Sequence, residues 1–157
     1  MEIYVNGLKL SNPDFSQFIN CKVAIGGCFD LLHHGHISLF SYVLLKHGNY
    51  VVLMNSDESV RSLKGQRRPL FSFEQRASVV SMLKGCEGVI RFDELSPTDV
   101  LLRLRPLIFV KGEEYKTRYI EEREHLITNC ITVDYAPFAI NVSSTEIVRK
   151  IEEKLNG

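Results

Sequence analysis

The stretch that most constrains the fold runs from residue 23 to residue 36 and reads VAIGGCFDLLHHGH. An apolar run, two glycines and a set of imidazoles in this order predict a buried strand, a tight turn and a helix that opens near His36. Gly26 and Gly27 lack side chains that would keep an anion from the backbone, and the N–H groups at a helix start attract negative charge. His33 and His36, three residues apart, are expected on one face of the first turn. The stretch therefore predicts a phosphate site.

The length of 157 residues predicts one domain with a sizeable core, preceded by an N-terminal extension over residues 1–21, so that the main domain covers 22–157. The 19 basic and 19 acidic side chains cancel, which gives no general reason to expect binding to nucleic acid or a membrane. No apolar run approaches the ~20 residues of a membrane span, and the N-terminus does not resemble a signal peptide. A cytoplasmic protein is expected.

The four cysteines are far apart and form no CxxC pair, which predicts reduced, buried thiols: Cys21, Cys28, Cys86 and Cys130.

Apolar runs alternate with helix signals along the chain. The runs that read as strands cover residues 22–25, 50–54, 88–90, 107–110 and 130–133, and the helices between and after them are expected near 36–47, 73–84, 97–105, 117–128 and 144–155. This alternation predicts an α/β fold with a Rossmann-like, parallel five-stranded sheet and helices on both faces. Residues 1–20 are expected to form an irregular extension or a short hairpin packed on the domain.

Several polar residues follow the predicted strands directly. Ligands of parallel sheets bind at the carboxyl ends of the strands, where the glycine turn, Asn55 and Lys111 are all expected. The capping box that begins at Ser143 predicts a helix start that could reach the same edge. Its hydroxyls have two readings from this segment alone, as helix caps or as phosphate ligands.

A basic stretch lies between residues 61 and 68, with Arg61, Lys64, Arg67 and Arg68 and no acid among them. The ordinary reading is a solvated run of charge. Gly65 and the following Pro69 favour an exposed loop, and four positive charges in a net-neutral chain predict a local phosphate clamp.

The spacing of His33, Gly35 and His36 matches the HxGH signature, and the chain thereby resembles the nucleotidyltransferase superfamily with its cytidylyltransferase-like fold. The resemblance extends along the chain, which is similar in particular to the adenylyltransferase domain of ADP-heptose synthase. It is carried by the segments NSD at 55–57, SVR at 59–61, LKG at 63–65, RP at 68–69, Arg76, FD at 92–93, RP at 105–106, VKG at 110–112 and SST at 143–145.

The resemblance implies transfer of AMP from ATP to a sugar 1-phosphate such as a heptose 1-phosphate, with release of pyrophosphate. Mg²⁺ would be held by the substrate and by no metal ligand of the protein, and a homodimer is expected. The catalytic residues implied are His33, His36 and Lys64. The nucleotide would contact the two histidines together with Gly27, Cys28, Phe29, Gly35, Asn55, Lys111, Ser143, Ser144 and Thr145, and the acceptor would contact Asp30, Lys64 and Arg68.

The chain departs from the family pattern at Glu113 and Glu114, where a glycine and an aspartate are typical. Three alternatives remain open at this stage. A cytidylyltransferase acting on glycerol 3-phosphate or a related alcohol phosphate shares the HxGH and late serine–threonine motifs. A non-catalytic nucleotide-binding module would show a degenerate HxGH motif, which is intact here, and a nucleic-acid-binding protein would need a wider basic surface.

Overall fold

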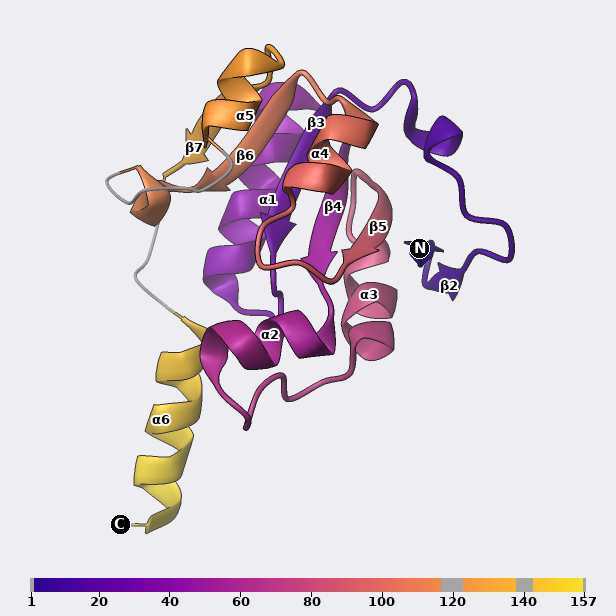
Figure 1. Cartoon of the computed structure of the whole chain (residues 1–157). Helices are drawn as coiled ribbons and strands as arrows, with labels where there is room; N and C mark the ends of the chain where they lie inside the picture. The colour runs from indigo at the N-terminus through magenta and orange to yellow at the C-terminus, as the bar shows by residue number, and fades with distance from the viewer. Residues whose placement is uncertain (1, 117–122, 138–142, 157) are drawn as a thin grey trace.

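The computed structural model describes residues 2–116, 123–137 and 143–156. A single sheet has the strand order β2-β1-β5-β4-β3-β6-β7 and carries helices on both faces (Figure 1). The strands are β1 Ile3–Val5, β2 Leu8–Lys9, β3 Val23–Gly27, β4 Tyr50–Asn55, β5 Cys86–Phe92, β6 Ile108–Gly112 and β7 Thr132–Ala136. The helices are η1 Phe15–Phe18, α1 His34–His47, α2 Asp57–Lys64, α3 Phe73–Ser81, α4 Thr98–Leu104, η2 Glu113–Tyr115, α5 Arg123–Thr128 and α6 Ser144–Asn156.

The five predicted strands form the parallel part of the sheet, β3 to β7, but the sheet has seven strands rather than five. The two additional strands come from the N-terminal segment, where β1 pairs antiparallel with both β2 and β5. Asn6 and Gly7 have φ angles of 49° and 80°, the left-handed pair of a two-residue hairpin turn. Of the two alternatives expected for residues 1–20, the short hairpin packed on the domain is therefore confirmed, with Asn6-Gly7 as its turn. Strands of three and two residues are too short for periodicity to give their bounds.

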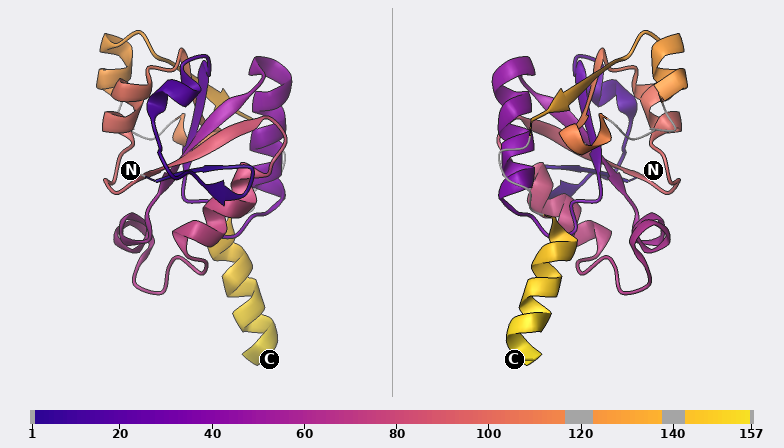
Figure 2. Two further views of the ribbon diagram at one scale, coloured as in Figure 1. Left: turned by 90° about the vertical axis from the view of Figure 1, so that its right-hand side faces the viewer. Right: turned by 90° about the vertical axis from the view of Figure 1, so that its left-hand side faces the viewer.

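Each face of the sheet has its own apolar core, and β4 contributes to both. Tyr50, Val52 and Met54 pack on the side of α1 and α3, whereas Val51 and Leu53 pack on the side of α4 and α5. Figure 2 shows the sheet edge-on between these helices. A strand that is apolar at every position is what a parallel sheet covered on both faces requires.

One helix lies where an exposed loop was predicted. Arg61 and Lys64 belong to α2, whose N-cap Ser56 accepts a hydrogen bond from the Ser59 amide at 3.2 Å. Acidic residues in its first turn and basic residues in its last turn match the helix dipole, which stabilises this short helix. The expected loop begins only at Gly65, whose φ of 94° ends the helix.

Smaller differences concern helix ends and cysteines. α1 begins at His34, two residues earlier than predicted, and α5 covers the described part of the predicted helix 117–128, of which 117–122 lie outside the described residues. The described side chains of α5 are exposed except Leu126, which is fully buried in the core on the side of α4 and α5. The cysteines are free thiols, and Cys130 is exposed rather than buried because it follows α5 in a turn with φ of 58°.

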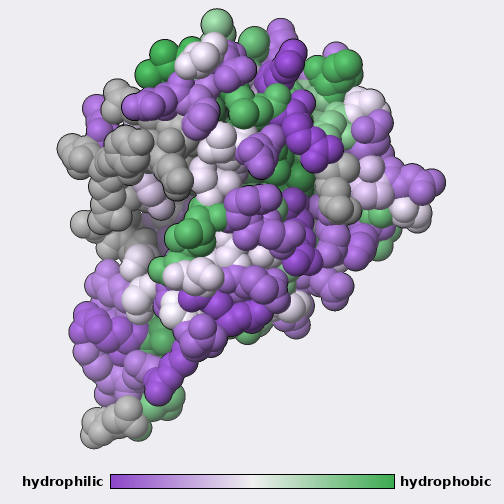
Figure 3. All heavy atoms as spheres, viewed as in Figure 1, coloured by the Kyte–Doolittle hydropathy of each residue, from purple (hydrophilic) through white to green (hydrophobic). Residues whose placement is uncertain are grey.

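The C-terminal helix α6 extends away from the body of the domain in all views (Figures 1 and 2). Hydrophilic residues cover much of α2 and α6 on the face shown in Figure 3, with isolated apolar residues between them. None of the helices in the described part of the chain is both long and apolar enough to span a bilayer.

Candidate functional site

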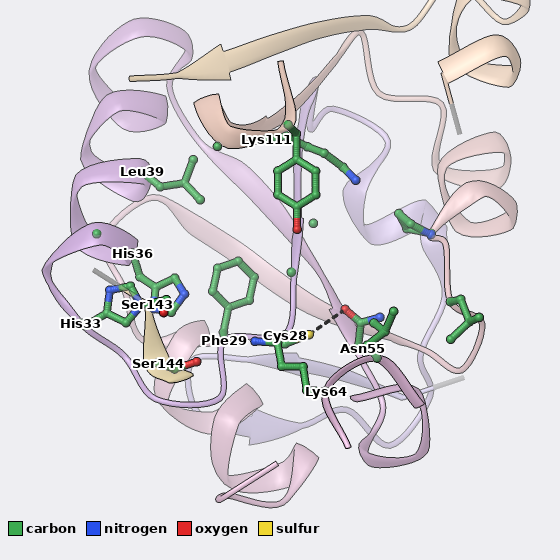
Figure 4. Close-up of a pocket in the computed structure, with 18 of the residues that line it drawn as sticks. Cys28, Phe29, His33, His36, Leu39, Asn55, Lys64, Lys111, Ser143 and Ser144 are labelled. Atoms are coloured by element: carbon green, nitrogen blue, oxygen red, sulfur yellow. Dashed lines mark hydrogen bonds between the residues drawn. The ribbon is translucent and has the colours of Figure 1, made fainter. Parts of the chain in front are cut away.

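The carboxyl ends of β3, β4, β5 and β6 surround a cavity of about 350 Å³ (Figure 4). The glycine turn, Asn55, Lys111 and the start of α6 meet there, as the position of each after its strand predicts. The lining consists of Gly26, Gly27, Cys28, Phe29, His33, Gly35, His36, Leu39, Asn55, Leu63, Lys64, Phe92, Leu95, Pro97, Lys111, Gly112, Tyr115, Ser143 and Ser144. Three predicted site residues lie outside this lining, namely Asp30, Arg68 and Thr145.

The two glycines of the turn are required by the rings that pack against them. A Cβ at Gly26 would lie 2.8 Å from the Phe109 ring, and one at Gly27 would lie 2.9 Å from the Phe29 ring. The sequence interpretation, that a phosphate approaches the backbone of these glycines, stays a prediction, and the structure adds ring packing as a second reason for glycine. The space that a side chain would occupy is filled by phenylalanine, while the backbone of both glycines borders the cavity.

Phe29 packs against one of the two histidines. Its φ of 46° is unusual for a bulky residue and marks local backbone strain at this turn. The buried ring packs against His36 in an edge-to-face arrangement with centroids 5.3 Å apart, and against Phe40 at 5.2 Å. The strained turn thus places an apolar support under one of the two imidazoles.

His33 and His36 lie against each other, with ring centroids 3.8 Å apart and planes 24° from parallel. Burial lowers the pKa of both, and burial together with the nearby His33 and Lys64 lowers the pKa of His36 to about 3. The Nδ1 atom of each ring is buried without a hydrogen-bond partner among the described residues. Leaving a buried polar atom unpaired costs about 1–3 kcal/mol, and such atoms are characteristic of sites that a ligand completes. A neutral imidazole N–H can donate to a phosphate oxygen.

Cys28 and Asn55 line the cavity together with the histidines. The Cys28 thiol donates to the Asn55 side-chain oxygen at 3.6 Å, and the Asn55 amide donates to Ser59 Oγ at 2.9 Å. Burial raises the pKa of the Cys28 thiol, so the thiol stays protonated near neutral pH. These bonds orient Asn55, and the raised pKa argues against Cys28 as a nucleophile.

Of the four cations in the predicted phosphate clamp, Lys64 alone is part of the cavity lining. Arg61 pairs with Glu58 at 2.7 Å on the outer face of α2, Arg67 is exposed, and Arg68 is buried elsewhere. Lys111 adds a second cation from the end of β6, with its ammonium group 4.6 Å from the centre of the Tyr115 ring. Two lysines from different strand–helix units therefore face the same cavity.

Asp30 and Arg68 form a buried ion pair behind the turn. Arg68 Nη1 donates to Asp30 Oδ2, and the other carboxylate oxygen accepts from the amides of Leu70 and Phe71 at 2.6 and 3.3 Å. Arg68 Nη2 donates to the carbonyl oxygen of Ser144 at 3.0 Å. Both side chains are thus occupied by contacts within the protein.

Arg76 is a supporting residue to which the sequence interpretation assigned no role. Its guanidinium group is buried and donates to the carbonyl of Cys28, to the carbonyl of Asn55 at 3.0 Å, to the Asp57 carboxylate at 2.8 Å and to the carbonyl of Phe71 at 3.1 Å. It therefore joins the ends of β3 and β4. The signal was an arginine beside Ala77 on the apolar face of a predicted helix. The lining residues that the interpretation also missed are Leu39, Leu63, Phe92, Leu95, Pro97, Gly112 and Tyr115.

The first turn of α6 brings hydroxyls to the cavity. Ser143 Oγ accepts a hydrogen bond from the Glu146 amide at 3.2 Å, which is a cap, and Ser143 and Ser144 both border the cavity. Capping and lining are compatible because a hydroxyl oxygen that accepts one bond can still donate its own proton. Thr145 is exposed on the next position of the helix.

The donor set of the cavity suits a metal ion only when phosphate supplies most of the ligands. Among the described lining residues there is no carboxylate, and no group of three or more His, Cys, Asp or Glu side chains in the described part could hold a metal. The carboxylate of Asp30, which lies outside the lining, binds Arg68 and two backbone amides. A Mg²⁺ ion carried by a triphosphate fits this environment, because Mg²⁺ is commonly held by phosphates and water.

A family model described as cytidylyltransferase-like matches residues 24–150. The chain belongs to this family. By family and by fold it is a nucleotidyltransferase domain, and the matched residues include every side chain that borders the cavity. The histidine pair, the glycine turn and the first turn of α6 all lie within the matched range and border the same cavity.

Curated relatives share the same stretch. The bifunctional protein HldE of Geobacter sulfurreducens is 38% identical over 130 residues, which cover 82% of this chain and 26% of the relative. The bifunctional protein HldE of Shewanella amazonensis is 37% identical over 129 residues, covering 82% of this chain and 27% of the relative. The chain thus spans about a quarter of the length of these relatives.

Solved structures share the fold. A lipopolysaccharide core biosynthesis protein from Thermoplasma volcanium superimposes with a TM-score of 0.61 at 24% identity, covering 78% of this chain and 98% of that one. A protein of unknown function from Archaeoglobus fulgidus gives a TM-score of 0.56 at 25% identity, with 76% and 100% covered.

Proposed function

We propose that this domain transfers AMP from ATP to a sugar 1-phosphate of the heptose 1-phosphate type and releases pyrophosphate. The observation that carries the proposal is the stacked histidine pair, whose two buried Nδ1 atoms have no partner among the described residues. The two histidines border a cavity that also presents a glycine turn, a helix start and two lysines. This combination of neutral donors, backbone N–H groups and cations is suited to a triphosphate.

The reaction requires little acid or base chemistry from the protein. A phosphate oxygen of the acceptor attacks the α-phosphorus, the bond from that phosphorus to the bridging oxygen breaks, and pyrophosphate leaves with the electron pair. Negative charge grows on the leaving oxygens, where N–H donors of His33 and His36 and the ammonium group of Lys64 stabilise it. Bound Mg²⁺ would neutralise part of the phosphate charge. Positioning by these groups supplies most of the acceleration.

The lining suggests how the nucleotide lies. The triphosphate would occupy the part of the cavity formed by the histidines, Gly27 and the first turn of α6. The apolar part, formed by Phe92, Leu95 and Pro97, offers a surface for the ribose and base, with Lys111 beside it. Lys64 would contact the acceptor phosphate. The acceptor contacts predicted for Asp30 and Arg68 stay predictions, and their observed contacts support a different role, which is argued below.

A second candidate is cytidylyl transfer to glycerol 3-phosphate or a related alcohol phosphate. The description of the matching family, cytidylyltransferase-like, favours it. The likeness to HldE proteins along 82% of the chain favours the sugar phosphate. The cytoplasmic location and the homodimer expected from the sequence belong to the proposal and remain to be measured.

Label transfer tests the proposal. ATP or CTP carrying ³²P at the α-phosphate is incubated with Mg²⁺ and either a heptose 1-phosphate or glycerol 3-phosphate. The proposal expects label to move from ATP to the heptose phosphate, and to stay on ATP when His36→Ala replaces the wild type. Movement of label only from CTP to glycerol 3-phosphate would establish the second candidate instead. Binding of nucleotide without any transfer would indicate a non-catalytic module.

A further inference from the structure

The buried ion pair of Asp30 and Arg68 joins three segments that are distant in sequence. Asp30 belongs to the turn after β3, and it accepts hydrogen bonds from two amides of the loop between α2 and α3. Arg68, from that same loop, spans from the Asp30 carboxylate to the Ser144 carbonyl at the start of α6. The arginine side chain is 8% exposed and the aspartate side chain 0%. Both terminal nitrogens of Arg68 therefore already donate to protein oxygens, and the pair is closed to solvent.

The third of these segments begins α6, the helix that points away from the domain (Figures 1 and 2). α6 extends away from the body, so its first turn carries the connection (Figures 1 and 2). That same turn provides Ser143 and Ser144 to the cavity lining. The position of these hydroxyls therefore depends on what holds the first turn, and Arg68 donates directly into it at 3.0 Å.

We propose that Arg68 is a positioning residue for nucleotide binding: anchored by Asp30, it holds the first turn of α6 against the cavity. The inference rests on the proposed function, because it takes the nucleotide as the ligand of Ser143 and Ser144. It gives Arg68 no contact with the acceptor. The nucleotide affinity then depends on Arg68, which binds the first turn of α6 and does not touch the nucleotide itself.

The chemistry of the side chain explains why arginine stands at position 68. A guanidinium group presents parallel donors in a rigid plane, so one nitrogen can bind a carboxylate while the other binds a carbonyl. The ammonium group of a lysine is a compact charge on a flexible stem and does not span both acceptors in one fixed geometry. Arg68→Lys therefore keeps the charge near Asp30 while loosening the connection to α6.

The first test measures affinity without catalysis. The non-cleavable analogue α,β-methylene-ATP is titrated with Mg²⁺ into the wild type, Arg68→Lys and the matched control Arg149→Gln. Arg149 pairs with Glu153 on the exposed part of α6, so its loss removes an arginine–carboxylate contact without affecting the connection to the domain. We expect about tenfold weaker binding in Arg68→Lys, the size of one charged hydrogen bond, and unchanged binding in Arg149→Gln.

Steady-state kinetics separates positioning from acceptor contact. The inference expects Arg68→Lys to raise the KM for ATP and to leave the KM for the acceptor unchanged. Asp30→Asn, which weakens the anchor, should act in the same direction, and the double variant should add little to either single variant. A rise confined to the acceptor KM would overturn the inference and support the predicted acceptor role.

A readout independent of activity uses amide hydrogen exchange of the ligand-free protein. In Arg68→Lys the amides of Glu146 to Val148 should exchange at least several-fold faster than in the wild type, while those of β3 and β4 are unchanged. Equal exchange in α6 would overturn the inference. If the wild type binds neither ATP nor CTP, the proposed function fails, and faster exchange in α6 would still support the attachment through Arg68.

Discussion

The imidazole rings of His33 and His36 lie stacked with their centroids 3.8 Å apart, and neither Nδ1 atom has a hydrogen-bond partner in the described part of the chain. Two adjacent imidazoles cannot both be charged at low cost, and burial lowers the pKa of each. On the proposed function, the pair enters the reaction neutral. It would then offer N–H donors that gain strength as negative charge grows on the phosphates.

Replacing one ring tests this role directly. His36→Ala should fold normally and lower turnover by about 10²- to 10³-fold, the usual loss when one donor to a developing charge is removed. His34→Ala is the matched control, because His34 is exposed and its ring contacts only Ser38 at 3.3 Å among the polar groups described. The measurement is pyrophosphate release, with circular dichroism to verify folding. Equal turnover in wild type and His36→Ala would remove His36 from the mechanism.

The depressed pKa of His36 predicts how stability changes with pH. The pKa is about 3 in the folded protein against an ordinary value of 6.5, so between these values the unfolded chain binds a proton that the folded chain does not. Stability is fully present above pH 6.5 and is lost as the pH falls toward 3. Between pH 7 and pH 5 we expect a loss of about 1–2 kcal/mol in urea unfolding. His36→Ala should flatten this dependence, and a slope unchanged by the substitution would contradict the assignment.

Arg76 should matter for stability more than any exposed arginine. Arg76→Met leaves the carbonyls of Cys28 and Asn55 without their donor, and we expect a loss of about 3–5 kcal/mol in the free energy of unfolding. Arg61→Gln is the comparison, since its pair with Glu58 is exposed and contributes little. Urea titration of both variants measures the difference. Similar losses in the two variants would show that Arg76 does not brace the site.

Gly26 and Phe109 should be coupled energetically. A Cβ at position 26 would lie 2.8 Å from the Phe109 ring, so Gly26→Ala should cost about 1–3 kcal/mol through overpacking. Phe109→Leu makes room, and the double variant should be more stable than the sum of the two losses predicts. Strict additivity in a double-mutant cycle would argue that Gly26 is required for a reason other than this ring.

Much of the parallel sheet was readable from the sequence, because long apolar runs and capping boxes are local signals. The position of Asn55, Lys111 and Ser143 at one edge followed from the rule that ligands bind at the carboxyl ends of parallel strands. A short hairpin packed on the domain was one of the two alternatives for residues 1–20, and the structure confirms it at Ile3–Val5 and Leu8–Lys9. Its pairing with β5 was not predicted, because that pairing is long-range.

The roles of the arginines could not be read in the same way. Arg68 looks like surface charge in the sequence, and the signal for Arg76 is only its place beside Ala77 on the apolar face of a predicted helix. The tertiary structure shows which carbonyls and carboxylates the two arginines bind. The predicted clamp failed for this reason, since a run of charge has no periodicity that separates a buried arginine from an exposed one. The ring packing at Gly26 was likewise invisible, because Phe109 comes from a strand 83 positions later in the chain.

The measurement that tests the central claim most directly is pyrophosphate release by the wild type with Mg²⁺ and either ATP or CTP. Each nucleotide is offered with heptose 1-phosphates, hexose 1-phosphates and glycerol 3-phosphate in turn. The account predicts release with ATP and a sugar 1-phosphate, and none without an acceptor. Pyrophosphate release with CTP and glycerol 3-phosphate alone would contradict the assigned substrates. No pyrophosphate release with any acceptor, despite measurable ATP binding, would contradict catalysis by the histidine pair.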